Sequence, residues 1–112
     1  MKIYHNPRCR KSREGVQYLT DKKINFEIFD YLKEGVSEDD IKSILKKLNM
    51  SAIEIVRKNE KIWKDNFKGK ELKEEQIISI LCEEPKLIER PIIVHKNKAV
   101  IGRPKENIDN LL

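Results

Sequence analysis

The amino-acid sequence predicts an α/β fold, a single domain over residues 1–112 that is built on a mixed β-sheet. Two observations predict this. An apolar segment, a helical segment and a segment of alternating polarity open the chain, which is the pattern of a parallel βαβ unit. Two strand-like segments around a tight turn come near its end, which is the pattern of an antiparallel hairpin. The predicted order is β-α-β, a helical insertion at about 31–85, and β-β-α.

The βαβ unit rests on three segments. Lys2–Tyr4 is expected to be a strand, and the segment from Ser12 to about Lys22 a helix with Val16 and Leu19 turned inward. Ile24–Phe29 alternates apolar and polar residues, which is the period of a strand. The two strands are expected to be parallel, with a right-handed connection between them.

Three helices are expected in the insertion. Ser37–Asp40 resembles a capping box with Asp in place of Glu, and an apolar helical face follows it. Ser51–Glu54 is a full capping box and begins a short helix through Val56, and Leu72–Cys82 gives the third helix. A charged loop precedes the third helix, and its aromatic side chains are expected to form a small satellite core rather than a base-stacking platform. This loop is centred on three residues, Trp63, Phe67 and Gly69.

The end of the chain predicts a hairpin and a helix. Pro91–His95 and Ala99–Ile101 are expected to pair across a turn in which Asn97 takes a positive φ. Pro104 suits the first turn of a final helix that ends at Leu112. A parallel βαβ half joined through helices to a ββα half is the thioredoxin-like arrangement, here with an expanded middle.

Composition limits the possible functions. The chain has 24 Lys and Arg against 19 Asp and Glu, a net charge of +5, which favours an anionic partner. The charges are interspersed, so a small oxyanion is favoured over nucleic acid. Two cysteines without a Cys-x-x-Cys motif exclude a disulfide scaffold and leave a zinc site short of ligands, so no metal is expected. A cytoplasmic protein with no signal peptide and no membrane segment is expected.

Cys9 is the residue whose setting most strongly indicates chemistry. It follows the turn His5-Asn6-Pro7-Arg8 and stands at the start of the first helix, among four basic residues. A helix N-terminus and nearby cations favour the thiolate, which is the reactive species. The alternative is a buried structural cysteine. Cys82 is expected to have a core role, although a Cys9–Cys82 disulfide remains open at this level.

Four segments resemble those of the glutaredoxin-dependent arsenate reductases, in the order that this family shows. They are His5–Arg13, Val56–Asn59, Glu89–Val94 and Ile101–Pro104. Each segment alone is a weak signal, whereas the cysteine motif followed by three ordered arginines is specific. The resemblance covers nearly the whole chain and implies the same thioredoxin-like fold.

The resemblance implies the reaction. Cys9 would attack arsenate and form a thiol–arsenate ester, surrounded by three arginines, Arg57, Arg90 and Arg103. Glutathione would react with this adduct as co-substrate, glutaredoxin would resolve the mixed disulfide, and arsenite would be released. The implied partners are therefore arsenate, glutathione and glutaredoxin, with no bound cofactor. Guanidinium groups would offset the repulsion between thiolate and oxyanion, and a lone thiol needs an external one to be regenerated.

Four further residues receive supporting roles from the resemblance. His5 and Ser12 would lie near the thiolate, where His5 either tunes the thiol or simply ends the strand by bonding the turn. Pro91 and Asn6 would be structural at the site, and the resemblance makes a cis Arg90–Pro91 bond the expected form.

Two other classes of protein share this fold. Spx-type transcription regulators bind RNA polymerase and typically carry Cys-x-x-Cys, where this chain has Cys9-Arg10-Lys11-Ser12. A thiol reductase of the same fold acting on another substrate is the other alternative. Arg10 and Lys11 also depart from the small residues that are common at these positions, so they either strengthen or crowd the anion field.

Overall fold

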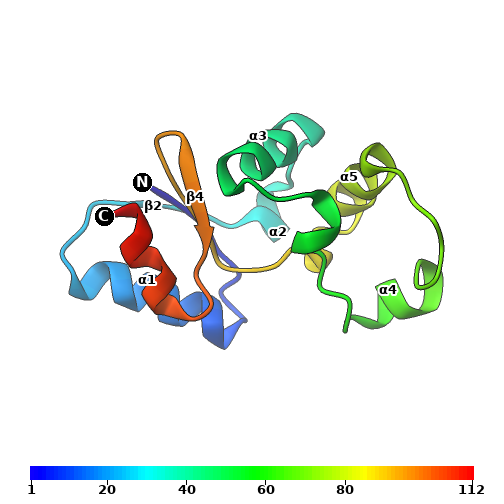
Figure 1. The fold of residues 1–112 in the computed structure, drawn as a ribbon. Helices are drawn as coiled ribbons and strands as arrows, with labels where there is room; N and C mark the ends of the chain where they lie inside the picture. Colours follow the sequence, from blue (N-terminus) through cyan, green and yellow to red (C-terminus); the bar gives the residue numbers. More distant parts are fainter.

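Four strands form one mixed sheet in the order β2-β1-β3-β4 in the computed structural model, which describes all residues from 1 to 112 (Figure 1). β1 pairs with β2 in parallel, and β3 pairs with both β1 and β4 in antiparallel. The strands are β1 (Lys2–Tyr4), β2 (Glu27–Phe29), β3 (Ile92–His95) and β4 (Lys98–Ile101). The mixed α/β arrangement is the one that the sequence predicts.

The parallel strands are joined by α1 (Arg10–Asp21), which starts two residues before the predicted Ser12. β2 is shorter than the predicted Ile24–Phe29, because β1 offers only three residues, one partner each, to the parallel ladder. The apolar side chains before β2, Ile24 and Phe26, pack instead against the hydrophobic cluster beneath α1.

The segment between β2 and β3 is helical, as predicted, but contains more elements. It comprises α2 (Tyr31–Glu34), α3 (Glu38–Leu48), η1 (Ala52–Ile55), α4 (Lys61–Asn66), α5 (Glu74–Glu83) and η2 (Pro85–Leu87), where η marks a 3₁₀-helix. Both predicted capping boxes are present, Ser37 with Asp40 and Ser51 with Glu54. The second box begins a 3₁₀-turn that ends at Ile55 instead of a helix through Val56.

The prediction of a loop around Trp63 is wrong, because this segment contains α4. Trp63 is buried and packs on Phe67 with 5.5 Å between ring centroids. It belongs to the same hydrophobic cluster as the buried residues of α3 and α5 rather than to a separate satellite core. Burial of this large ring stabilises a helix that has little local signal of its own.

The two faces of the sheet belong to two hydrophobic clusters. Ile3 and Ile93 face the cluster that contains Leu19 of α1, whereas Tyr4 and Ile92 face the cluster of the helical insertion. Figure 1 shows α1 and the C-terminal helix on one side of the sheet and α3 on the other. Because side chains alternate between the two faces of a strand, adjacent residues of β1 and of β3 pack into different clusters.

The hairpin differs from the prediction in its turn. Lys96, not Asn97, has the positive φ, at 56°. His95 pairs with Lys98, which leaves a two-residue loop, and a loop with positive φ only at its first position is of the II′ kind. After β4 the chain forms η3 (Lys105–Leu111), with Pro104 at its N-cap. None of the helices is both long and apolar enough to span a membrane.

Candidate active site

Four chain segments meet at one edge of the sheet because of the strand directions. They are His5–Cys9 after β1, Asp30–Tyr31 after β2, Arg90–Pro91 before β3 and Gly102–Arg103 after β4. The His5 N–H donates to the Phe29 carbonyl at 2.9 Å, and the Gly102 N–H donates to the Pro91 carbonyl at 2.8 Å. Residues as far apart in the sequence as His5 and Arg103 therefore lie at one edge of the sheet.

Cys9 lies at this edge as the N-cap of α1, with an extended backbone of φ −92° and ψ 122°. Its N–H donates to the Asn6 carbonyl and its own carbonyl accepts the Arg13 N–H, each at 3.0 Å. The side chain is partly exposed, so the thiol is accessible at the positive end of the helix dipole.

The surroundings of Cys9 favour the thiolate. Burial raises the pKa of the Cys9 thiol, but the Arg90 guanidinium and the backbone N–H groups of Ser12 and Lys11 outweigh it, and the pKa lies below 9.0. At Cys82, burial and the acidic residues around α5 raise the pKa of the thiol. Both cysteines are free, so the disulfide left open by the sequence is not formed. Of the two thiols, Cys9 is therefore the one whose surroundings favour the thiolate, the reactive form.

His5, Asn6 and Ser12 form a buried hydrogen-bonded group under the cysteine loop. The Ser12 hydroxyl, which is fully buried, lies 2.7 Å from His5 Nδ1 and accepts the Asn6 N–H at 2.9 Å. Burial lowers the pKa of His5, against the opposing effect of Asp30. The Asn6 side chain accepts the Arg8 N–H at 3.0 Å. His5 and Ser12, predicted to lie near the thiolate, and Asn6, predicted to be structural, are thus hydrogen-bonded to or within the loop that carries Cys9.

Arg90 is the predicted arginine whose guanidinium acts on Cys9. It is buried, its Nη1 donates to the Lys86 carbonyl at 3.0 Å, and its Nε has no hydrogen-bond partner. The Arg90–Pro91 bond is cis, as expected. Pro91 is buried between two glycines, where an added Cβ would come within 2.9 Å at Gly15 and 3.1 Å at Gly102. Because glycine has no Cβ, Pro91 packs closely against Gly15 and Gly102, and this packing fixes the backbone position of the adjacent Arg90.

Arg57 lies near this segment but is held by an acidic residue. Its backbone N–H donates to the Leu87 carbonyl at 2.7 Å, and an isolated antiparallel bridge between Val56 and Ile88 aligns the two segments. Its Nη2 is 3.6 Å from Glu60, while its buried Nη1 has no hydrogen-bond partner. Arg57 therefore has one donor committed to a carboxylate and one that is buried without an acceptor.

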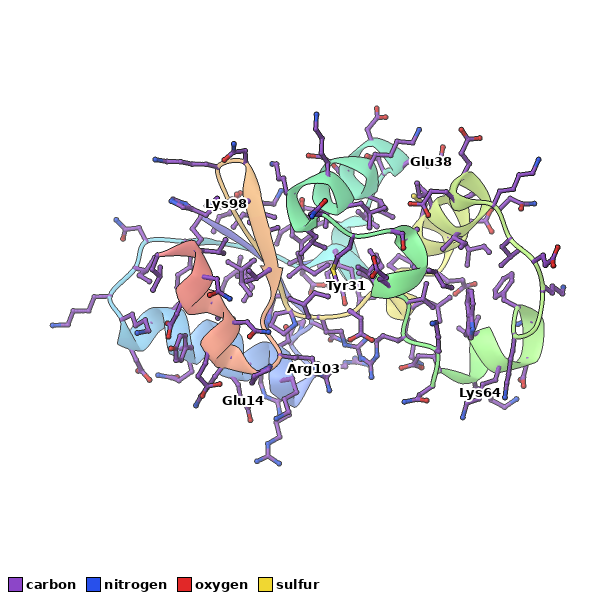
Figure 2. All side chains as sticks on the ribbon, viewed as in Figure 1. Glu14, Tyr31, Glu38, Lys64, Lys98 and Arg103 are labelled. Carbon is purple, nitrogen blue, oxygen red and sulfur yellow. The ribbon has the colours of Figure 1, made fainter.

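Arg103 is placed differently from the other two. It follows β4 at the site edge, at the opposite end of that strand from Lys98 (Figure 2). Its side chain is exposed, and its charge lowers the pKa of Glu89, which burial raises overall. The structure thus brings Arg103 to the rim of the site rather than against the thiol.

The two basic residues after the cysteine do not crowd it. Arg10 and Lys11 are the first two residues of α1. Arg10 Nε and Lys11 Nζ each lie 3.5 Å from a carboxylate oxygen of Glu14, which is one helical turn further along. Both side chains are exposed. It is the backbone N–H of Lys11, not its ammonium group, that acts on the thiol.

Comparison with known proteins places this site in a family. The ArsC family model matches residues 4–111, which include every site segment described above. The chain belongs to the ArsC family. An arsenate reductase of Haemophilus influenzae is 37% identical over 112 residues, which is 98% of this chain and 97% of the relative. The uncharacterized protein YfgD of Escherichia coli is 42% identical over 110 residues, 96% of this chain and 92% of the relative.

The solved structures agree with the sequence comparison. An arsenate reductase from Vibrio cholerae superposes with a TM-score of 0.94 at 34% identity, covering 100% of this chain and 98% of that one. This ArsC-family chain therefore has the thioredoxin-like fold that the element order predicts.

One residue of this ArsC-family site, Tyr31, is not predicted from the sequence. Tyr31, labelled in Figure 2, follows β2, is 1% exposed, and its hydroxyl has no hydrogen-bond partner. Burial raises the pKa of Tyr31 to about 12, against the effect of Arg90 and together with that of Cys9. A signal was available, because two parallel strands end at the same edge of a sheet and place the residues after them side by side.

Proposed function

We propose that this protein is an arsenate reductase that uses glutathione and glutaredoxin. The observation that carries the proposal is the Cys9 thiol at the start of α1, with a lowered pKa and the Arg90 guanidinium acting on it. Relatives at 34–37% identity are named arsenate reductases. A thiolate beside a buried arginine can approach a negatively charged oxyanion without prohibitive repulsion.

The first step would form the thiol–arsenate adduct. The Cys9 thiolate attacks arsenic, an S–As bond forms, and an As–O bond breaks so that the oxygen leaves as water after protonation. Arg90 would offer the unpaired N–H of its Nε to the oxyanion, and Arg57 would offer its unpaired Nη1. Arg103 would contribute from the rim. His5, Ser12 and Asn6 would act by holding the loop.

The second step would reduce arsenic. A glutathione thiolate attacks the Cys9 sulfur, the S–As electron pair stays on arsenic, and As(V) leaves as As(III) in arsenite. Cys9 is left as a mixed disulfide with glutathione. A glutaredoxin thiolate then attacks the glutathione sulfur and releases the Cys9 thiolate. Cys82 lies on α5, outside the four segments that meet at the site, so an external thiol would be needed to regenerate Cys9. A reducing cytoplasm is the compartment that supplies these thiols.

The test is arsenate-dependent NADPH consumption with glutathione, glutaredoxin and glutathione reductase. Cys9→Ser should abolish turnover, while the matched variant Cys82→Ser should retain it. Arg90→Lys should lower kcat/KM for arsenate by about 10²-fold, as for loss of an oxyanion donor. Arg103→Lys should have a smaller effect, since that side chain is exposed.

Absence of arsenate-dependent turnover in folded wild-type protein, with several thiol donors tried, would refute the proposal. A pull-down of RNA polymerase would then test the regulator alternative. Turnover that survives Cys9→Ser would refute the assigned nucleophile.

A further inference from the structure

Three buried side-chain atoms have no hydrogen-bond partner within the protein, and all three belong to residues of the candidate active site. They are the hydroxyl oxygen of Tyr31, Nε of Arg90 and Nη1 of Arg57. Each of these groups carries a hydrogen that it can donate at neutral pH. Buried polar groups are nearly always paired, so three unpaired donors in one region indicate an acceptor that comes from outside the chain.

The segment η2 connects the three residues in space. Its Lys86 carbonyl accepts Nη1 of Arg90 at 3.0 Å. Its Leu87 carbonyl accepts the backbone N–H of Arg57 at 2.7 Å. The helix α2, which begins at Tyr31, packs against η2, and the Tyr31 ring and Leu87 are fully buried in the same hydrophobic cluster. The three donors therefore come from three parts of the chain that meet at η2.

The Tyr31 hydroxyl also lies within electrostatic reach of Cys9. Burial raises the pKa of Tyr31 to about 12, the Arg90 guanidinium opposes this rise, and the charge of Cys9 adds to it. The same guanidinium lowers the pKa of the Cys9 thiol. The hydroxyl nevertheless makes no hydrogen bond to that thiol. The hydroxyl, the thiol and the guanidinium therefore share one environment, in which the hydroxyl stays protonated at neutral pH.

Packing of the ring does not account for the hydroxyl of Tyr31. A phenylalanine would bury the same ring, whereas an unpaired buried hydroxyl destabilises the folded state. With a pKa of about 12, the hydroxyl is a hydrogen-bond donor and not a base at neutral pH. The acceptor that suits it is anionic, because the other unpaired donors of this region are the guanidinium groups of Arg90 and Arg57.

We propose that the Tyr31 hydroxyl donates a hydrogen bond to an oxygen of the oxyanion that is held at Cys9, beside the guanidinium groups of Arg90 and Arg57. The proposal rests on the proposed function for the identity of the oxyanion, arsenate. It adds to the three arginines a neutral donor that follows β2, the strand on the other side of β1 from β3. The hydroxyl destabilises the unliganded protein and is satisfied when the oxyanion binds.

The test is the protection of Cys9 from iodoacetamide by arsenate at neutral pH and constant ionic strength, measured by mass spectrometry. Alkylation forms an S–C bond and releases iodide, so arsenate at the thiol slows it. Tyr31→Phe removes only the hydroxyl. The matched control Tyr18→Phe removes the hydroxyl that donates to Asp109 at 2.7 Å, on the later part of α1. Each protein, including the reference, also carries Cys82→Ser, so that Cys9 is the one thiol that reacts.

Tyr31→Phe should raise the arsenate concentration that halves the alkylation rate by about 10- to 100-fold, as for a lost hydrogen bond to a charged group. Tyr18→Phe should need the same arsenate concentration as the reference. Without arsenate, Tyr31→Phe should be alkylated at the reference rate, because the hydroxyl makes no hydrogen bond to the thiol. Its urea midpoint should equal or exceed that of the reference, since no internal hydrogen bond is lost.

Three outcomes would overturn the proposal. Arsenate might fail to protect the reference protein, or it could protect Tyr31→Phe equally well, and either result would show that the hydroxyl does not bind the oxyanion. A lower urea midpoint of Tyr31→Phe without arsenate would show that the hydroxyl is bonded within the protein and has a structural role.

The same experiment separates this proposal from the proposed function. Protection that depends on Tyr31, in a protein that does not reduce arsenate, would uphold the oxyanion contact and refute the proposed reductase. Arsenate reduction with protection that is independent of Tyr31 would refute the contact and leave the reductase standing.

Discussion

Removing the Ser12 hydroxyl tests whether the buried group under the cysteine loop holds the site together. Ser12 is fully buried in the first turns of α1, and its hydroxyl serves both His5 Nδ1 and the Asn6 N–H. Ser12→Ala keeps the side-chain shape and removes only this oxygen. Both partners then lose their hydrogen bond in a place that water does not reach, since His5 and Asn6 are buried as well.

The magnitude follows from these two contacts. An unpaired buried N–H at Asn6 costs about 1–3 kcal/mol, and the lost bond to His5 adds about 0.5–1.5 kcal/mol. The better helix propensity of Ala returns about 0.5 kcal/mol. The free energy of unfolding should therefore fall by about 1–4 kcal/mol, a large part of the roughly 5–15 kcal/mol that is usual for a domain.

Urea denaturation followed by far-UV circular dichroism measures this loss. The control is Ser43→Ala, which removes an exposed serine from the middle of α3 and should change stability by less than about 0.5 kcal/mol. With a loss of about 2.5 kcal/mol, the middle of that range, and an m-value of about 2 kcal/mol per molar urea, the midpoint of Ser12→Ala should drop by about 1 M. A midpoint equal to that of the control would refute the argument, because it would mean that the hydrogen bonds of the Ser12 hydroxyl do not stabilise the folded protein.

Three further outcomes are expected. Arg90→Met should raise the pKa of Cys9, measured as the pH dependence of iodoacetamide alkylation, and an unmoved titration would show that the guanidinium does not act on the thiol. Because the pKa of His5 is lowered in the folded state, its stabilising contribution is present above pH 6.5 and is lost as the pH falls through the lowered value. Urea midpoints of wild type and His5→Asn should therefore converge in acid, and a constant difference would contradict this. Gly15→Ala would place a Cβ 2.9 Å from Pro91 Cγ, and overpacking of about 1–3 kcal/mol should exceed the helix gain of about 1 kcal/mol, so a higher midpoint would count against it.

Elements with a local signal could be predicted from the sequence. The capping boxes at Ser37 and Ser51 are encoded within four residues, and the structure contains both. The hairpin follows from two strand-like segments around a short turn, although Lys96 rather than Asn97 takes the positive φ. The residue type at a turn constrains φ only weakly. The register of the flanking strands decides which position of the turn takes a positive φ.

Features set by distant contacts could not be predicted in this way. α4 has no side-chain cap and is six residues long, so its stability comes from Trp63 packing into a core built by other helices. The motifs ranked Arg57, Arg90 and Arg103 equally. In the structure Arg57 lies beside the Glu60 carboxylate, Arg90 donates to a backbone carbonyl, and Arg103 is exposed. A sequence motif specifies none of these surroundings.

Cys9 follows β1, a central strand of the sheet, so neighbouring chain segments lie on both sides of it. A cysteine after an edge strand would have protein on one side only, whereas the loop after β1 has β2 on one side and β3 on the other. The antiparallel β3 brings Arg90 to the loop from one direction, and the parallel β2 brings Asp30 and Lys33 from the opposite one. The strand order of the mixed sheet therefore decides which segments surround Cys9, before any side chain is placed.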